Sequence, residues 1–273
     1  MTARTDHHGL DPIIFERIRL EPTAVWHPLI SFAFVQGMSQ IPISDSELLQ
    51  SSHHLPIAID CMDDRLQVVA IVAGQYQRAP LLDSNGHWQR GYMPIALRCL
   101  PFRSAGDTVE VATNVEVHQG PPLPIVAEDG SPTAEVQQII RMLRKLDTGQ
   151  QRLQRAAERL FIADVLTPFQ MMKMPGSATA LSRFLTVDRN KFSMMSNRRI
   201  AQISRDDFLP IDVAAACLFS QRLLPAAISV AADTRELNDA GRPNGQPDIG
   251  FKSHAQLDPS ELFSFEAFSG ADN

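Results

Sequence analysis

Two neighbouring histidines and three nearby aspartates lie in the segment SSHHLPIAIDCMDD, residues 51–64. These are ligand types of zinc and non-haem iron sites, in which two or three such groups converge on one ion. Their spacing fits no short metal motif, because adjacent histidines on a strand point to opposite faces and DCMDD has the composition of a solvated turn. The segment offers one candidate metal site, with His53, His54 and Asp60 as ligands.

A second candidate site lies in GHWQRGYMPIALRCLPF, residues 86–102, which crowds aromatic and arginine side chains between a glycine and two prolines. Trp88 and Tyr92 carry large rings with polar edges, and Arg98 adds a cation, so the three could line a small-ligand pocket. Aromatic side chains beside a hairpin more often pack across strands, and we favour that interpretation. His87 has no neighbour in sequence that would hold its tautomer for acid–base catalysis.

Methionine-rich and phenylalanine-rich segments are candidates for protein contacts. Half of the ten methionines fall within residues 171–195, where flexible thioethers suit both core gaps and adaptable partner surfaces. Near the C-terminus, ELFSFEAF follows a segment dense in Gly, Pro, Asn and Asp, and aromatic side chains behind such a linker usually dock on a protein surface. We therefore predict partner contacts through Met171, Met172, Phe263, Phe265 and Phe268.

Short motifs of the common catalytic and nucleotide-binding sites are absent from the chain. It contains no G-x-G-x-x-G, Walker-type loop, G-x-S-x-G, S-x-x-K, C-x-x-C or H-E-x-x-H. Many chemistries have no short motif, so a non-catalytic role is favoured while the enzyme class stays open. No residue pattern in the sequence indicates a particular cofactor.

The first half of the chain has the patterns of a sheet that could position these residues. Residues 66–74 form a β-branched apolar run typical of a buried strand, and residues 107–115 alternate between apolar and polar side chains. The Asn-Gly pair in DSNG predicts a tight turn, with residues 76–82 and 87–92 pairing across it. Ser44 and Glu47 have the spacing of a capping box that starts a short helix.

The second half reads as helix. Ser131 and Pro132 can start a long amphipathic helix, continuous or kinked near Gly149 and stopped by Pro168. Residues 210–224 are apolar on nearly all sides and predict a central helix. The long helix also has a basic stripe, interpreted as a solvated face rather than a dock for an acidic partner: Arg144, Arg152, Arg155 and Arg159. Its core-facing residues are expected to be Val136, Ile139, Leu143, Leu146, Gln150, Leu153, Ala157 and Leu160.

Length and composition predict a globular protein, because 273 residues with 44% apolar side chains can bury a core. The formal net charge of −6 argues against nucleic acid as a partner, since nucleic-acid binding depends on clustered Lys and Arg that contact the phosphates. Cys61, Cys99 and Cys217 are separated and have apolar neighbours, so we expect reduced core thiols, as in the cytoplasm. No apolar run approaches the roughly 20 residues of a membrane span, and no secretion signal is found.

The predicted fold class is α+β, with a mainly antiparallel sheet in the N-terminal half packed with a long amphipathic helix and a C-terminal helical region. We expect three parts along the chain. They are an N-terminal arm at residues 1–25, an α+β domain at 26–235 with a sheet-rich part (26–125) and a helix-rich part (126–235), and a flexible linker with a Phe-rich tail at 236–273.

A resemblance to a known family is carried by the order and spacing of the following segments: FAFVQGMSQIPISDSELLQSSHHLPIAI (32–59), GHWQRGYMPIALRCLPF (86–102), VAEDGSPTAEVQQIIRMLRKL (126–146), and FLTVDRNKFSMMSNRRIAQISRDDFL (184–209) with ACLFSQRLL (216–224). In this order and spacing the chain resembles the SapC family, bacterial proteins named from a surface-array locus. The resemblance covers roughly residues 26–230 and makes the prolines and aromatics of 86–102 a fold signature. The chain departs from the family pattern at Leu55, where Tyr is usual, and in RCLPF, where RRYPF is usual.

The resemblance implies an association with S-layer or surface polysaccharide systems, flavin-dependent halogenase-like enzymes and outer-membrane receptors; it brings no catalytic residues. Our leading hypothesis is a cytoplasmic, non-catalytic accessory protein that acts through protein–protein contacts in a surface-layer or nutrient-uptake system. One alternative is a metal-dependent oxygenase or a companion of a flavin-dependent halogenase-like enzyme. The other is a small-ligand-binding module, and a homo-oligomer is open in each case.

Overall fold

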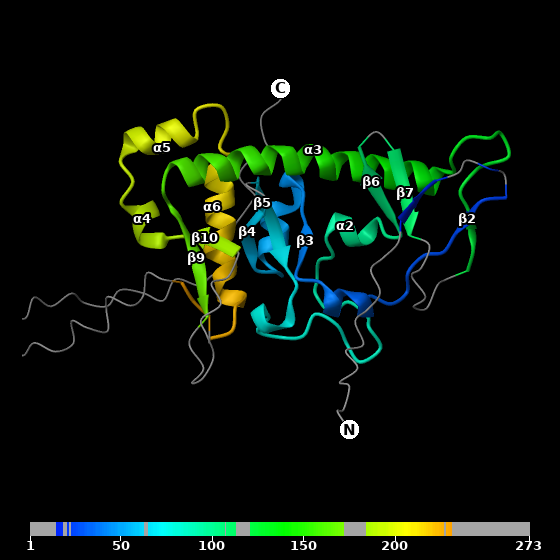
Figure 1. Cartoon of the computed structure of the whole chain (residues 1–273), viewed down its shortest axis with the longest axis horizontal. Coiled ribbons are helices and arrows are strands. Elements are labelled where there is room, and N and C mark those ends of the chain that lie inside the picture. The colour runs from blue at the N-terminus through cyan, green and yellow to red at the C-terminus, as the bar shows by residue number, and fades with distance from the viewer. Residues whose placement is uncertain are drawn as a thin grey trace, which may run out of the picture. The chain divides into compact units, whose positions relative to one another are not determined.

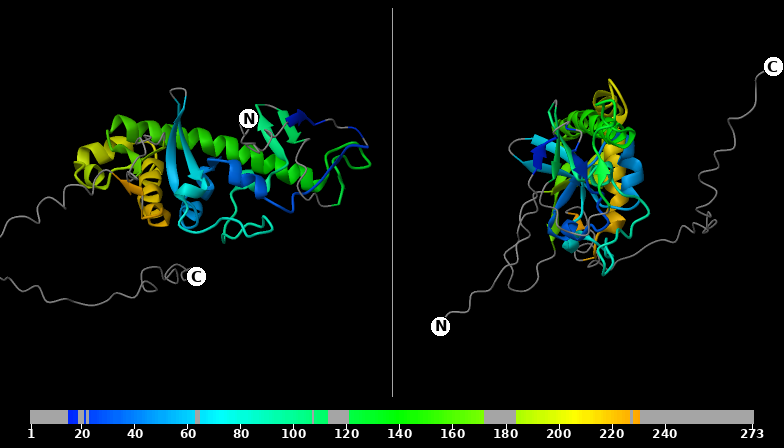
Figure 2. Two further views of the ribbon diagram at one scale, coloured as in Figure 1. Left: turned by 60° about the horizontal axis from the view of Figure 1, so that its bottom comes forward. Right: turned by 90° about the vertical axis from the view of Figure 1, so that its right-hand side faces the viewer.

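The computed structural model describes residues 15–18, 21, 23–62, 65–106, 108–112, 121–171, 184–226 and 228–230. All of these residues belong to the compact unit formed by residues 1–235. They combine antiparallel sheets with helices, which confirms the predicted α+β class (Figures 1 and 2).

A six-stranded antiparallel sheet is built from both halves of the chain, in the order β11-β9-β10-β4-β5-β3. Its strands are β3 (Gln40–Pro42), β4 (Ile57–Met62), β5 (Arg65–Ile71), β9 (Leu166–Met171), β10 (Phe184–Val187) and β11 (Ile228–Val230). The predicted strand at 66–74 is present as β5 over residues 66–71, whereas Gly74 begins a 3₁₀ turn. One face of β4 and β5 packs on the helices, while Ala58, Val69 and Ile71 pack with Tyr76, Phe169 and Phe184 on the other. Burial on both faces explains the nearly continuous apolar run.

Two smaller sheets complete the strands. One has the order β1-β7-β6, with β1 at Phe15–Arg17, β6 at Phe102–Ala105 and β7 at Thr108–Ala112. The other pairs β2 (Val25–Trp26) with β8 (Leu123–Pro124). Strand β7 confirms the alternating strand predicted at 107–115 over the residues that the structure describes there.

The long helix α3 (Ala134–Ile162) contributes to two of the three apolar clusters of the described residues (Figure 1). Its first half packs Val136, Ile139, Leu143 and Leu146 with Trp26 and Phe102, and its second half packs Leu153, Ala156, Ala157 and Leu160 with the large sheet. The amphipathic prediction is confirmed, except that Gln150 is only half-buried. The predicted start was wrong by two residues, because Thr133, not Ser131, accepts the capping hydrogen bond from the Val136 amide.

The end of α3 and the central helix also follow local chemistry. The helix continues through Gly149 and ends at Ile162, where Asp164 adopts a left-handed φ of 53°. Pro168 does not stop it but lies within β9, opposite Leu185. The predicted central helix is α6 (Leu209–Ser220), which packs against α3, α1 and the sheet. The remaining helices are α1 (Leu48–Ser52), α2 (Ile95–Arg98), α4 (Arg189–Ser193) and α5 (Asn197–Ile203).

Two local predictions were wrong. The tight turn predicted at DSNG is confirmed, with the Gly86 amide donating to the Asp83 carbonyl at 3.1 Å and a Gly86 φ of 80°. The segments on either side form no strands, however, because pairing between them is limited to the Leu82–Trp88 bridge and two flanking backbone hydrogen bonds. The preceding residues instead form a 3₁₀ turn at Gly74–Tyr76. Cys99 and Cys217 are buried thiols as expected, but Cys61 is exposed because it lies near the outer end of β4.

Candidate functional site

A buried carboxylate joins the capping box to the aromatic stretch. Glu47 is 2% exposed and closes the predicted capping box, with its Oε1 accepting from the Ser44 amide at 2.8 Å. Its Oε2 accepts from the Tyr92 hydroxyl at 2.7 Å and from the Ile95 amide at 2.8 Å. We call this arrangement the Glu47 clamp, because it ties the 3₁₀ turn Asp45–Glu47 to the first turn of α2.

The candidate ligand residues Trp88, Tyr92 and Arg98 are brought together beside this clamp. The Trp88 indole donates to the Tyr92 carbonyl at 2.9 Å, and the Arg98 guanidinium donates to the Tyr92 hydroxyl at 3.3 Å. Burial, and the hydrogen bond to Glu47, raise the pKa of Tyr92 well above its ordinary value of 10.0. The hydroxyl therefore stays a protonated donor. Because these polar groups are bonded within the chain, the geometry favours the packing interpretation over a ligand-lined wall.

The candidate metal ligands are not brought into one group. His53 and His54 end helix α1, with ring centroids 6.5 Å apart, rather than lying on a strand. Asp60 lies within β4, where it is buried and its Oδ2 accepts a hydrogen bond from the side-chain amide (Nε2) of Gln40 at 2.5 Å. Among the described residues, no three His, Cys, Asp or Glu side chains form a cluster that could hold a metal ion. The solvated turn predicted for DCMDD was wrong at Asp60, because the strand continues to Met62.

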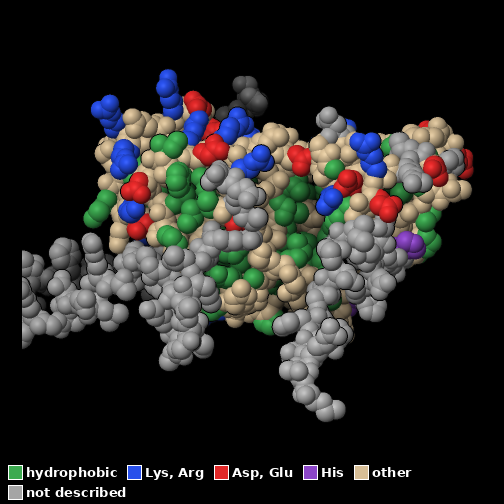
Figure 3. Space-filling model, in the orientation of Figure 1, with side chains coloured by type: hydrophobic (Ala, Val, Ile, Leu, Met, Phe, Trp, Pro, Cys, Tyr) green, Lys and Arg blue, Asp and Glu red, His purple; other side chains and the backbone are tan. Residues whose placement is uncertain are grey.

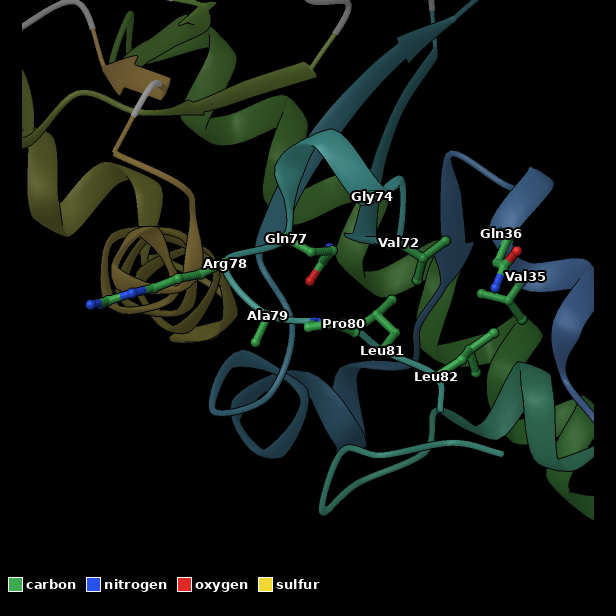
Figure 4. A pocket seen from close by; sticks show the side chains of 10 residues that line it. All are labelled: Val35, Gln36, Val72, Gly74, Gln77, Arg78, Ala79, Pro80, Leu81 and Leu82. Carbon is green, nitrogen blue, oxygen red and sulfur yellow. The ribbon is translucent and has the colours of Figure 1, made fainter. Parts of the chain in front are cut away.

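A cavity of about 350 Å³ opens beside the 3₁₀ turn Gly74–Tyr76 (Figure 4). The Gln77 amide stands in its wall and donates to the Ile71 carbonyl at 2.7 Å, while the Arg78 side chain points away from the other lining residues. The cavity adjoins the Leu82–Trp88 bridge. Sequence reasoning missed it, since its lining comes from two loops: Val35, Gln36, Val72, Gly74, Gln77, Arg78, Ala79, Pro80, Leu81 and Leu82.

Large apolar side chains are exposed on the elements that meet at the end of α3. The Lys191 ammonium pairs with Asp164 at 3.1 Å, and the Arg199 guanidinium donates to the Ala163 carbonyl at 3.1 Å, so α4 and α5 are held at this end (Figure 1). Arg159 ties it to Asp206, just before α6. We call the exposed apolar residues the α3-end surface: Phe161, Ile162, Met194, Ile200 and Phe208.

The basic stripe of α3 is partly neutralised. Arg152 pairs with Asp45 at 2.5 Å and lies 3.9 Å from Asp207, whereas Arg144 and Arg155 have no ion pair within the described residues. Exposed arginines also occur on α4, α5 and the loop that follows: Arg189, Arg198, Arg199 and Arg205. Figure 3 shows Lys and Arg side chains gathered over this end of α3. The surface around the end of α3 therefore combines exposed apolar side chains with arginines that lack an ion pair within the described residues, beside the paired carboxylates of Asp164 and Asp206.

The remaining predicted contact residues fall largely beyond what the structure describes. Met171 ends strand β9, and its side chain is not described. Met172, Phe263, Phe265 and Phe268 lie outside the described residues, as do the N-terminal arm up to residue 14 and the whole of 236–273. Contacts through these residues remain predictions.

Comparison with known proteins gives one family. A family model described as SapC matches residues 23–226. This range agrees with the resemblance expected over residues 26–230. No curated protein and no solved structure matches the chain. No helix among the described residues is both long and apolar enough to cross a membrane.

Proposed function

The chain belongs to the SapC family, and we propose that it is a non-catalytic accessory protein that binds another protein through the α3-end surface. The observation that carries this proposal is the exposure of large apolar side chains there. Met194 is 84% exposed and Phe208 is 74% exposed, on elements fixed to the same end of α3. Exposed apolar groups of this kind are typical of interaction surfaces when polar residues surround them.

The charges at this surface indicate the chemistry of the partner. Arg155, Arg198 and Arg205 are exposed and have no ion pair within the described residues. An acidic segment with apolar anchors would match both features, because opposite charge speeds encounter while buried apolar anchors supply most of the affinity. A flavin-dependent halogenase-like enzyme is the partner class that the resemblance suggests. We place this interaction in the cytoplasm, within a surface-layer or nutrient-uptake system.

Co-purification of the full chain from cells that produce it natively tests the proposal. The variants Phe208→Asp and Met194→Asp place a charge in the surface, and Leu49→Asp is the matched control, since Leu49 is a comparably exposed apolar residue on α1. We expect one acidic partner to be recovered with the wild type and Leu49→Asp, and to fall about tenfold or more with the other two. Equal recovery with all four proteins would refute the proposal.

A second candidate function, a small-ligand-binding module, is supported by the cavity beside Gln77. Its volume of about 350 Å³ lies within the range of ligand pockets, and its lining is mainly apolar with two side-chain amides, those of Gln36 and Gln77, and the arginine Arg78. Gly74 lines the cavity, and a Cβ added there would meet no atom within 4 Å, so Gly74→Leu should obstruct it without strain. Saturable tryptophan-fluorescence changes with a metabolite library, lost in Gly74→Leu but kept in Gln75→Leu, would support this function. Identical titrations of both variants would exclude it.

A further inference from the structure

Basic and aromatic side chains converge where α1 meets the end of α6, away from the α3-end surface. The turn that follows α1 contributes His53 and His54, and the loop before α2 contributes Arg90. Helix α6 contributes Phe219, and the 3₁₀ turn Gln221–Leu223 contributes Arg222. We call these five residues the α1–α6 cluster. They lie close together because α1 packs directly against α6.

An aromatic ring lies at the centre of this cluster. The Arg222 guanidinium carbon lies 4.0 Å from the centre of the Phe219 ring, and the His53 ring centre lies 4.6 Å from it. His54 is held beside Gly91, where a Cβ would come within 2.9 Å of its Cε1. The cation–π contact fixes the guanidinium on the ring, which leaves its N–H edge available to an anion.

The cluster brings two arginines and two histidines together without a counter-charge. No carboxylate among the described residues forms an ion pair with any of its members. Arg90 donates to the Ala79 carbonyl at 2.6 Å, while its buried Nε has no acceptor within the described residues. Burial, and then the charges of His53, Arg90 and Arg222, lower the pKa of His54. The charged form of His54 is therefore disfavoured beside the two guanidinium groups, and a bound anion would offset that cost.

We propose that the α1–α6 cluster binds an aromatic phosphomonoester. Two guanidinium groups match phosphate oxygens through paired N–H donors, and two imidazoles add hydrogen bonds to a dianion. The exposed ring of His53 and the Phe219 ring, 42% exposed, supply an apolar platform for the planar part of the ligand. Phosphate is favoured over a single carboxylate, because a dianion compensates more of the clustered positive charge.

Calorimetric titration of the full chain with phenyl phosphate and with inorganic phosphate tests the site, at about 0.15 M salt to screen general attraction. Phenyl phosphate should bind more tightly than inorganic phosphate. Arg222→Gln should weaken it about tenfold or more, since it removes a charge-assisted hydrogen bond. Phe219→Leu should weaken phenyl phosphate more than inorganic phosphate, because it removes the stacking platform as well as the ring that holds the Arg222 guanidinium. The control Arg141→Gln, on the exposed face of α3, should bind both like the wild type.

Three outcomes would overturn the proposal. They are the absence of saturable heat with phenyl phosphate, equal affinity for the two probes, and equal weakening by Arg222→Gln and Arg141→Gln. Circular dichroism of each variant separates loss of binding from loss of fold. The histidine Cε1–H resonances provide a second readout in the wild type, because phosphate bound in the cluster must shift those of His53 and His54. Unchanged resonances at saturation would also refute the site.

Discussion

Replacement of Glu47 by alanine should destabilise the fold more than any exposed substitution. The carboxylate accepts three hydrogen bonds, from the Ser44 amide, the Tyr92 hydroxyl and the Ile95 amide. Glu47→Ala leaves the two buried amides without their acceptor, at about 1–3 kcal/mol each, whereas the half-buried Tyr92 hydroxyl can turn to water. Release of the carboxylate from its desolvation penalty offsets part of this cost. We expect a net loss of about 3 kcal/mol in the free energy of unfolding.

Two milder substitutions should fall between Glu47→Ala and the wild type. Glu47→Gln keeps one acceptor oxygen but turns an NH₂ group toward a donor, which should cost about 1–2 kcal/mol. Tyr92→Phe removes the hydroxyl, which donates to Glu47 and accepts from Arg98, and should cost about 1 kcal/mol because the Arg98 bond is exposed to solvent. The control Glu158→Ala, on the exposed face of α3 with one hydrogen bond from Gln154, should change stability by less than about 0.5 kcal/mol.

Urea unfolding followed by circular dichroism measures these differences directly. The order of destabilisation should be Glu47→Ala, Glu47→Gln, Tyr92→Phe and then Glu158→Ala. If Glu47→Ala and Glu158→Ala have the same unfolding free energy, the clamp does not hold the turn to α2 and the reasoning is wrong. An inverted order of the two Glu47 variants would contradict the hydrogen-bond assignment.

Three further predictions use the same denaturation assay. Gly149→Ala should lower the free energy of unfolding by about 1–3 kcal/mol, because its Cβ would lie 2.9 Å from the Asp45 backbone nitrogen. This clash outweighs the roughly 1 kcal/mol that alanine gains over glycine in helix propensity. The control Thr148→Ala, at an exposed position, should be neutral or stabilising. Asp164→Gly should be about 1 kcal/mol more stable than Asp164→Ala, since both lose the Lys191 pair but only glycine is relaxed at a φ of 53°; equal stabilities would contradict this. The folded-state pKa of His54 lies below its ordinary value of 6.5, so the unfolded chain binds more protons and the free energy of unfolding falls as pH drops below about 6.5. Between about pH 7.5 and 5.5, His54→Asn should therefore lose less unfolding free energy than the wild type. Identical pH profiles of the two proteins would refute the effect.

Local patterns predicted the elements whose periodicity or capping signal lies within one segment of the chain. The spacing of Val136, Leu143 and Leu153 gave α3, and the Ser44–Glu47 spacing gave the capping box. The second oxygen of Glu47 was not predictable, because its partners Tyr92 and Ile95 lie 45 and 48 residues further along the chain. Long-range contacts of this kind depend on the tertiary fold, which periodicity does not encode.

The errors at the candidate sites have a common physical origin. His53 and His54 were interpreted as strand residues, but Ser52 and its neighbours form the last turn of α1. Asp60 was interpreted as a turn residue although β4 extends through it, paired with β5. Helix and strand compete closely in short segments, so tertiary contacts decide between them. The α3-end surface was missed because exposure of Phe208 or Met194 depends on which elements cover them.

Site-specific photocrosslinking in cells that produce the protein natively tests the central claim most directly. A photoreactive phenylalanine analogue replaces Phe208 in one strain, Met194 in a second and Leu49, on α1, in a third. We predict one crosslinked protein, shared by the Phe208 and Met194 positions, acidic and absent from the Leu49 position. Crosslinks of equal yield at all three positions, or none at Phe208 and Met194, would contradict a role through the α3-end surface.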